Sequence, residues 1–365
     1  MTLVSDAQRE QPSFDLRAHL ACDPSTVVFL STAFAFSSAL FSAVELGAFD
    51  ALEGNPATLD ELAQRLAVPA PALERLVVLL HSLGLLERDE HGRYRNAAVT
   101  SAMLTRSAPH SLCAFLLHQQ RHMYPLFEHL SDALRTGEAQ THRWSFARSP
   151  SDRAGYAALA DSPDDNRLFL RAMNAMAVGV GTVIAREVDF TNIATLADLG
   201  GGGGQIAIEL AEAVPHLQIT IVDGADACRF ADELVAARGL SARIHTCTGD
   251  FLARLPDELA GCEAVLLGGV LADWDASQQR VLLAEAHRIL APGGQLLVSE
   301  TLLDEDRSGP VLPALLSLAM LVGTRGRNFT PSEITAIVER AGFAHARVIS
   351  NRAHGVRDLV IASRS

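Results

Sequence analysis

The sequence predicts an α/β protein with a mainly helical N-terminal part and a C-terminal part built on a parallel sheet. From about Ile193 onward, apolar runs of strand length alternate with helix patterns, which is typical of a parallel sheet covered on both faces. Before that point, helical periodicity dominates. A chain of 365 residues with 48% hydrophobic content is long enough for about two domains.

The composition excludes several function classes. The net charge is −13, whereas a nucleic-acid binder normally shows a basic face, so we expect no nucleic-acid partner. Every basic residue is an arginine. A lysine therefore cannot serve as Schiff base or general base.

Cysteine usage and the N-terminus indicate a cytoplasmic protein. The cysteines are odd in number and have no C-x-x-C spacing, so neither a disulfide framework nor a cysteine zinc site is expected. The segment Met1–Arg17 lacks the basic-then-apolar order of a signal peptide. The cysteines are Cys22, Cys113, Cys228, Cys247 and Cys262.

The segment Pro24–Val44 carries no charge and is long enough to span a bilayer. It also contains many serines and threonines, lacks a flanking basic cluster, and is followed at once by Glu45. A helix buried all round, between subunits, is the favoured interpretation, and no membrane partner is expected.

Residues 1–105 have the element order of a winged helix. Thr58 and Glu61 form a helix-start pattern, a second helix follows from Pro71, and two strand-like pieces flank a turn at His91-Gly92. Such a unit can bind DNA or mediate dimerisation. The acidic charge around it favours dimerisation.

Residues 106–187 are expected to be a helical connector that lines a substrate pocket. A break is predicted near Arg135-Thr136-Gly137, and Asp164–Arg186 has the pattern of one long helix. That helix carries Phe169 and Met173. Residues of this kind at this spacing are more often core, but a pocket-lining role is the functional hypothesis.

Residues 188–365 are expected to form a Rossmann-like domain, which binds ligands at the carboxyl ends of its strands. The glycine run Gly200–Gly204 follows Asp198 and an apolar strand, and it precedes a helix. Glycines at such a turn let the backbone approach a ligand closely. The predicted strands and helices are Thr195–Leu199, Ile206–Ala213, Gln218–Asp223, Ala227–Arg238, Arg243–Thr248, Ala264–Gly268, Gln278–Leu290 and Gln295–Glu300.

Two further elements point to a nucleoside ligand. Asp223 ends the next strand, where a carboxylate can bind both hydroxyls of a ribose. Asp250 and Phe251 follow the third strand, where they can contact and stack on adenine. NAD is an alternative ligand for a glycine-rich turn, but the Gly-Asp-Phe pattern followed by Asp273-Trp274 favours S-adenosylmethionine.

At these motifs the chain resembles the class I O-methyltransferases that carry an N-terminal winged-helix dimerisation domain, such as caffeate-type and bacterial antibiotic-pathway enzymes. The resemblance extends over nearly the whole chain. The matching segments are Arg135-Thr136-Gly137, Asp198–Gly204, Gly249-Asp250-Phe251, Val270–Asp275, Leu290–Gly294 and Leu296–Glu300.

The resemblance implies S-adenosylmethionine as cofactor and a homodimer. It implies that Asp223 holds the ribose, that Asp250 and Phe251 hold adenine, and that Gly200, Gly202 and Gly204 cradle the methionine end. Asp198 and Trp274 are added as cofactor-binding residues because they belong to the matching motifs.

The sequence departs from the family where the family carries its general base. The usual histidine before Asp-Trp is Ala272, which cannot accept a proton. The glutamate that normally supports that histidine is Asn328, while a second flanking glutamate is kept as Glu300. Asn328, together with Met320 and His142, is expected at the substrate pocket.

His118 and His122 are candidates for a substitute base, with Glu300 as a third catalytic candidate. The two histidines are four residues apart and share a helix face. Metal binding is not expected, because the intervening position that carries glutamate in a metalloprotease motif is Gln119 and no third ligand is apparent. A structural role and a role in acid–base chemistry both stay open.

Three functions remain in competition. The leading hypothesis is a methyltransferase for a small, aromatic secondary metabolite, acting on oxygen, carbon or nitrogen by proximity. The second is a non-methylating enzyme that uses the bound sulfonium to stabilise charge in a hydroxylation, decarboxylation or pericyclic reaction. The third is a DNA-binding regulator that uses the winged helix.

Overall fold

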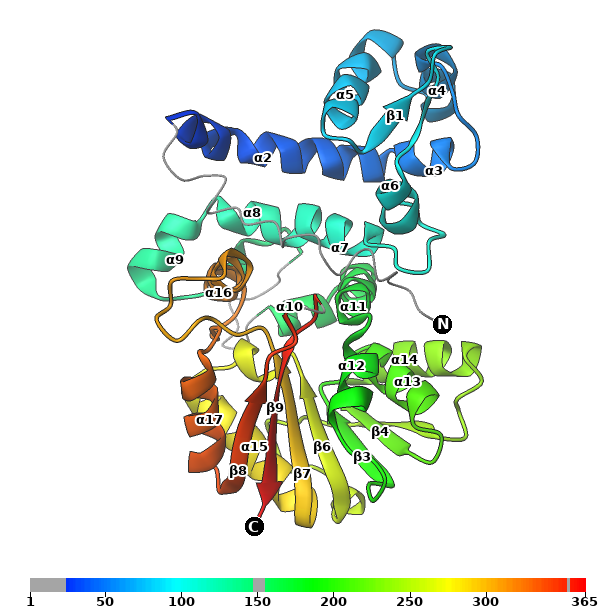
Figure 1. The fold of residues 1–365 in the computed structure, drawn as a ribbon. Coiled ribbons are helices and arrows are strands. Elements are labelled where there is room, and N and C mark those ends of the chain that lie inside the picture. The colour runs from blue at the N-terminus through cyan, green and yellow to red at the C-terminus, as the bar shows by residue number, and fades with distance from the viewer. Residues whose placement is uncertain (1–23, 147–154, 353–354) are drawn as a thin grey trace.

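The computed structural model describes residues 24–146, 155–352 and 355–365, which form three tiers. A small helical domain lies at one end, a tier of helices follows, and an α/β domain lies at the other end (Figure 1). The expectations for the N-terminal segment and Cys22 fall outside the described residues.

The first tier has the predicted winged-helix elements. Thr58 caps α4 in a full capping box with Glu61, as predicted. The strands β1 and β2 pair antiparallel around the predicted turn. The elements are α2 (Pro24–Glu45), α3 (Ala48–Leu52), α4 (Leu59–Leu66), α5 (Ala70–Ser82), β1 (Leu86–Arg88), β2 (Tyr94–Asn96) and α6 (Ala98–Met103).

Helix α2 leaves much of its apolar surface uncovered in the single chain. Val27 is 71% exposed and Phe34 is 60% exposed. By length and composition alone, α2 could cross a membrane. The opposite end of the helix is buried, because Phe41, Ala43 and Val44 pack in the core of the first tier.

The second tier is helical, and one prediction for it is wrong. The pattern Asp164–Arg186 is not one helix: α11 and α12 meet at a bend of 43°. Gly179 at the bend has φ of 87°, a left-handed conformation that ends a helix and that glycine adopts readily. The elements are α7 (Cys113–His118), a π-helical turn (Gln119–Met123), α8 (Tyr124–Phe127), α9 (Leu130–Thr136), a 3₁₀ turn (Thr141–Arg143), α10 (Tyr156–Ala160), α11 (Pro163–Ala177) and α12 (Val180–Glu187).

The third tier is a seven-stranded sheet in the order β5-β4-β3-β6-β7-β9-β8. Five strands are parallel, as expected, but β9 runs antiparallel to both of its neighbours, so the sheet is mixed. The strands are β3 (Thr195–Leu199), β4 (Gln218–Asp223), β5 (Ile244–Thr248), β6 (Cys262–Gly268), β7 (Leu290–Glu300), β8 (Phe343–Ile349) and β9 (Asp358–Arg364).

Alternate residues of each strand face opposite layers of helices. Leu196 packs with α12, α13 and α14, whereas its neighbour Ala197 packs with α15 and α17. The helices of this tier are α13 (Gln205–Ala213), α14 (Ala225–Ala237), α15 (Ala276–Ile289) and α17 (Pro331–Arg340), with short 3₁₀ turns at Asp257–Leu259 and Leu271–Asp273. Helix α16 (Val311–Gly323) comes later in the chain but lies with α8 and α9 of the second tier (Figure 1).

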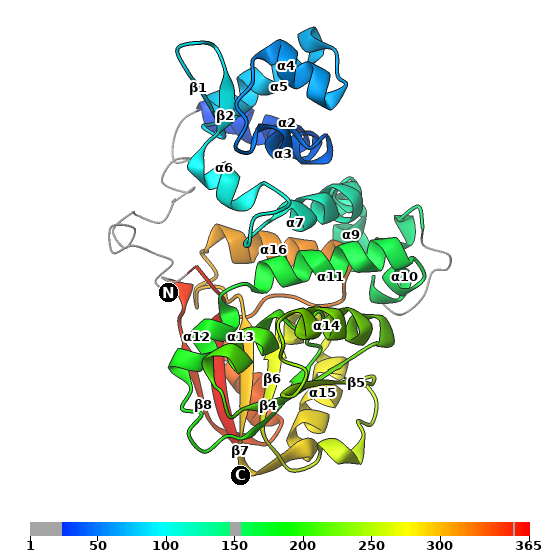
Figure 2. The ribbon, with the colours of Figure 1, turned by 90° about the vertical axis from the view of Figure 1, so that its right-hand side faces the viewer.

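The strand order places a ligand site at β3. The chain winds outward in both directions from this strand, to β4 on one side and to β6 on the other. Ligands of open α/β sheets bind beyond the carboxyl ends of the strands at such a switch point. In this chain, α11 and α16 lie across that end of the sheet (Figure 2).

Candidate active site

The glycine-rich loop joins the end of β3 to α13 and has little room for side chains. Gly200, Gly202 and Gly204 have φ values of 75°, 56° and 79°, which favour glycine. A Cβ at Gly203 would lie 2.6 Å from Oδ1 of Asn174, whereas nothing lies within 4 Å of a Cβ at Gly202. The loop is therefore tightly packed against Asn174 at Gly203, whereas its tip at Gly202 is open.

Asp198 lies buried beneath this loop. Both carboxylate oxygens are enclosed and have no hydrogen-bond partner among the residues that the structure describes. Burial, together with the charge of Asp223, raises the pKa of Asp198 to about 7. A buried carboxylate without partners is suited to a cationic ligand group.

Asp223 ends β4 beside the loop. Its Oδ2 accepts the N–H of Gly202 over 2.8 Å, and its Oδ1 accepts the N–H of Gly224 over 2.7 Å. Burial raises the pKa of Asp223, although these hydrogen bonds oppose the rise. The carboxylate is thus placed at the loop, as a ribose acceptor must be.

The candidates for adenine binding include two aromatic rings that contact each other. The ring of Phe251 meets that of Trp274 edge to face, with centroids 5.9 Å apart. Asp250 is exposed, and its Oδ1 accepts the N–H of Leu252 over 2.9 Å. The indole Nε1 of Trp274 is enclosed and has no partner within the described ranges.

These residues fit S-adenosylmethionine. The open loop tip, the unpartnered carboxylate of Asp198, the Asp223 carboxylate and the Phe251 ring match its methionine, ribose and adenine portions. When bound, this cofactor supplies an electrophilic methyl group on a sulfonium. The chain's own residues hold this cofactor.

Ala272 stands where the family carries its general base, and its backbone is in close contact with neighbouring residues. The N–H of Ala272 donates to Oε1 of Glu300 over 3.1 Å. A Cβ at Gly326 would overlap the carbonyl of Ala272, so the Gly326 backbone packs directly on this turn. Asn328 donates from Nδ2 to the carbonyl of Thr301 over 2.7 Å. Glu300 and Asn328 therefore support backbone here.

Two buried carboxyls flank Ala272. Burial raises the pKa of Asp273 to about 6 and that of Glu300 to about 7. The hydroxyl of Tyr156 donates to Oδ2 of Asp273 over 2.5 Å. Tyr156 was not predicted from the sequence as a site residue, since a single tyrosine in a helical segment carries no motif.

The predicted pocket residues differ in where they lie. The ring of Phe169 contacts the rings of His118 and Tyr156, at centroid distances of 5.5 Å and 5.6 Å. Met173 and Met320 are half-buried, on α11 and α16. His142 is exposed on its 3₁₀ turn.

His118 and His122 are brought together. Their Nδ1 atoms lie 2.6 Å apart, and Nε2 of His122 lies 2.8 Å from Oδ1 of Asp165. The sequence does not single out Asp165, because its position in the first turn of a helix already accounts for an aspartate. Within the described chain, no group of three or more His, Cys, Asp or Glu side chains is arranged so that it could hold a metal ion.

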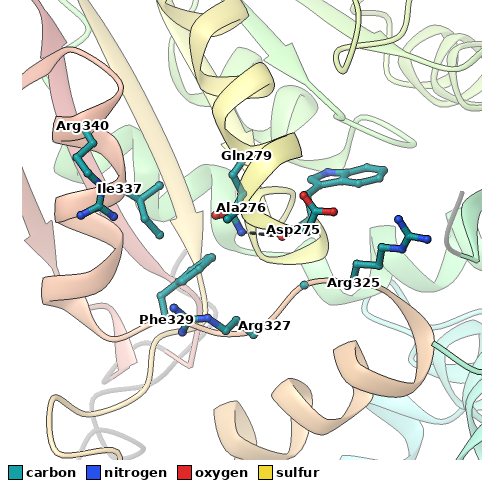
Figure 3. A pocket seen from close by; sticks show the side chains of 10 residues that line it. Asp275, Ala276, Gln279, Arg325, Arg327, Phe329, Ile337 and Arg340 are labelled. Atoms are coloured by element: carbon teal, nitrogen blue, oxygen red, sulfur yellow. Dashed lines mark hydrogen bonds between the residues drawn. The ribbon is translucent and has the colours of Figure 1, made fainter. Parts of the chain in front are cut away.

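A surface pocket of about 270 Å³ is lined by Trp274, Gln279 and Phe329 (Figure 3). Arg325 and Arg340 line it, together with Asp275 at the start of α15. Arg327 also lines it, but this side chain pairs with Glu333 over 2.9 Å and lies over the Phe329 ring. Arg327 thus has a structural role.

Comparisons with known proteins agree with this geometry. The O-methyltransferase domain family matches residues 127–344, and the O-methyltransferase dimerisation domain family matches residues 28–106. The chain is 35% identical over 338 residues to 3-hydroxy-5-methyl-1-naphthoate 3-O-methyltransferase of Streptomyces sahachiroi, covering 92% of this chain and 94% of that protein.

Two further relatives are informative. The chain is 35% identical over 275 residues to the N,N-dimethyltransferase OxyT of Streptomyces rimosus, covering 75% of this chain and 77% of OxyT. Human N-acetylserotonin methyltransferase, solved with S-adenosylmethionine, superimposes with a TM-score of 0.86 at 29% identity, covering 94% of this chain and 99% of that one. The chain therefore belongs to the S-adenosylmethionine-dependent O-methyltransferase family, with an N-terminal dimerisation domain and a C-terminal methyltransferase domain.

Proposed function

We propose that this methyltransferase acts on a small aromatic secondary metabolite, held between the second tier and the carboxyl end of the sheet. The observation that carries this proposal is a row of aromatic rings running from α11 to the cofactor loops. Phe169 contacts Tyr156, and Tyr156 contacts Trp274, each at a centroid distance of 5.6 Å. Flat apolar ligands stack well on such a row.

The relatives support an aromatic substrate but leave the attacked atom open. One of them is named for a naphthoate hydroxyl, and OxyT is named for an amine. An amine attacks as the free base, and an ionised phenol is already an anion. Proximity and orientation accelerate both reactions without the missing histidine, by roughly 7–11 kcal/mol in favourable systems.

We further propose that the protein works as a homodimer, with no nucleic-acid or membrane partner. The dimerisation domain supports this, as does the uncovered apolar surface of α2, which a second copy would bury. The net charge of −13 opposes binding to nucleic acid or to an anionic lipid surface.

Product analysis tests the proposed activity. Purified protein is incubated with S-adenosylmethionine and a panel of naphthols, hydroxynaphthoates, indoles and aromatic amines, and the products are analysed by mass spectrometry. We expect at least one product heavier than its substrate by one methylene, with one S-adenosylhomocysteine formed per turnover. A substrate that is converted without that gain would favour the non-methylating alternative.

A further inference from the structure

The structure holds a hydrogen-bonded chain of three buried side chains, Asp165, His122 and His118. Their exposed fractions are 1%, 0% and 5%. Asp165 lies in the first turn of α11, whereas the histidines lie on α7 and on the π-helical turn that follows it. A π-helical turn within a helix is uncommon and occurs frequently at functional sites. Here it sets the two rings edge to face at a centroid distance of 4.7 Å.

Asp165 is held as a carboxylate. It accepts hydrogen bonds from Ser162 and Arg121, and Nε of Arg121 lies 2.5 Å from Oδ1. Burial alone would raise the pKa of Asp165, but the hydrogen bonds from Ser162 and His122 and the charge of Arg121 together keep this pKa below its ordinary value. Oδ1 therefore accepts a hydrogen bond from Nε2 of His122, 2.8 Å away.

The chain fixes the tautomer of both histidines. Burial lowers the pKa of His122, and burial together with His122 lowers that of His118 to about 3, so both rings are neutral near pH 7. A neutral His122 that donates from Nε2 can only accept at Nδ1. His118 must then donate from its own Nδ1 across the 2.6 Å contact, which leaves its Nε2 without a proton.

The bare Nε2 of His118 is unused within the described part of the chain, since the only hydrogen bond of this side chain is that to His122. The His118 ring packs on Phe169, and Phe169 packs on Tyr156, which donates to Asp273 beside Ala272. His118 is thus linked by side-chain contacts to the turn where the family's base is missing.

We propose that Nε2 of His118 accepts the proton of a phenolic hydroxyl of the substrate, with His122 and Asp165 as positioning residues. This proposal rests on the proposed function and adds the substrate group that the site recognises: a hydroxyl that still carries its proton. The O–H bond breaks as the oxygen forms its bond to the methyl carbon, while the C–S bond breaks and sulfur keeps the electron pair.

The proton has a defined path. It binds to Nε2 of His118 while the Nδ1 proton of His118 passes to Nδ1 of His122. The positive charge then lies on His122, beside the carboxylate of Asp165. An isolated His118 would be a weak base because its surroundings disfavour a charge there, and the transfer moves that charge to the residue with a counter-ion.

The test compares two phenols that the wild-type enzyme methylates, one weakly acidic and one nitrated analogue that is ionised at the assay pH. His118→Ala should lower kcat for the weakly acidic phenol by about 100-fold or more and leave the ionised phenol within a few-fold. Added imidazole should restore part of the lost rate. Asp165→Asn should lower kcat for the same phenol by about tenfold.

The control is His129→Ala, which removes a half-exposed histidine 3.7 Å from Asp132 on the surface and should leave both rates unchanged. Equal losses for both phenols without rescue by imidazole would overturn the proposal, as would wild-type rates in His118→Ala. Failure of the wild-type enzyme to methylate any phenol or amine would instead count against the proposed function.

A second measurement does not depend on stable variants. In wild-type protein labelled with ¹⁵N-histidine, the nitrogen shifts of His118 should show a protonated Nδ1 and an unprotonated Nε2 near neutral pH. A proton on Nε2 would overturn the proposal, because that atom could then only donate.

Discussion

The carboxylate of Asp223 holds the tip of the glycine-rich loop: its Oδ2 accepts the N–H of Gly202 over 2.8 Å. The end of β4 and the loop that follows β3 are thus tied together at the switch point of the sheet. The same side chain is the proposed ribose acceptor, so loop geometry and cofactor affinity are coupled through one residue.

Replacing Asp223 by alanine should weaken S-adenosylmethionine binding by about 100-fold, since two charge-assisted hydrogen bonds to ribose would be lost. Calorimetric titration of the variant measures this. Asp232→Ala is a suitable control, because its exposed carboxylate contacts Thr246 on the neighbouring strand. Similar affinities for wild type and Asp223→Ala would place the ribose elsewhere.

Gly203→Ala should destabilise the fold and weaken cofactor binding. The new Cβ would lie 2.6 Å from Asn174 and 2.7 Å from Phe230, so the loop or α11 must shift. Such overpacking costs roughly 1–3 kcal/mol of unfolding free energy, measurable by urea denaturation. Gly224→Ala is the matched control: nothing lies within 4 Å of its Cβ, and its φ of −62° suits alanine. An unfolding free energy of Gly203→Ala equal to that of the wild type would contradict the close packing of Gly203 against Asn174 and Phe230.

Asp198 should make both stability and cofactor affinity depend on pH. Its pKa is about 7 in the folded chain and about 3.9 when unfolded, so the folded state binds a proton that the unfolded state has lost. The unliganded protein should therefore lose stability as pH rises from about 4 to about 7.

The affinity for the cofactor should increase as pH rises, whereas the stability of the unliganded protein should decrease. A cationic ligand favours the ionised carboxylate of Asp198, so S-adenosylmethionine should bind more tightly as pH rises through about 7, with release of a proton. Calorimetry in buffers of different ionisation enthalpy detects that proton. Asp198→Asn should remove the trend, and an unchanged trend in this variant would assign it to another group.

The apolar surface of α2 should be a subunit interface. In the double variant Val28→Glu and Phe34→Glu, two exposed apolar side chains become charged, and the dimer dissociation constant should rise by at least about 100-fold. Sedimentation analysis measures this. Val281→Glu, at a 42% exposed position on α15, should not change it. Dimers of unchanged affinity in the double variant would show that α2 lies outside the interface.

The sequence predicted the parts of the fold and of the site that depend on local chain geometry. The positions of β3 and β4, the glycine loop and the Thr58 capping box follow from apolar period and turn chemistry, and the structure confirms them. The break at Gly179 was missed because the apolar pattern continues across it from α11 into α12.

The remaining features depend on long-range packing, which periodicity does not encode. The last two strands, β8 and β9, were not anticipated, since the insertion of a reversed strand, β9, between β7 and the edge strand β8 has no local motif. The link from His122 to Asp165 joins residues 43 positions apart in the chain. Only the fold brings that aspartate to the two histidines, whose spacing alone was visible in the sequence.

The most direct test of methyl transfer by this chain uses S-adenosylmethionine with a deuterated methyl group and a naphthol or aromatic amine that the enzyme accepts. We predict a product that carries all three deuterium atoms on one new methyl group, together with an equal amount of S-adenosylhomocysteine. A converted substrate without deuterium, or no conversion of any compound in the panel despite cofactor binding, would contradict the claim that this chain transfers a methyl group.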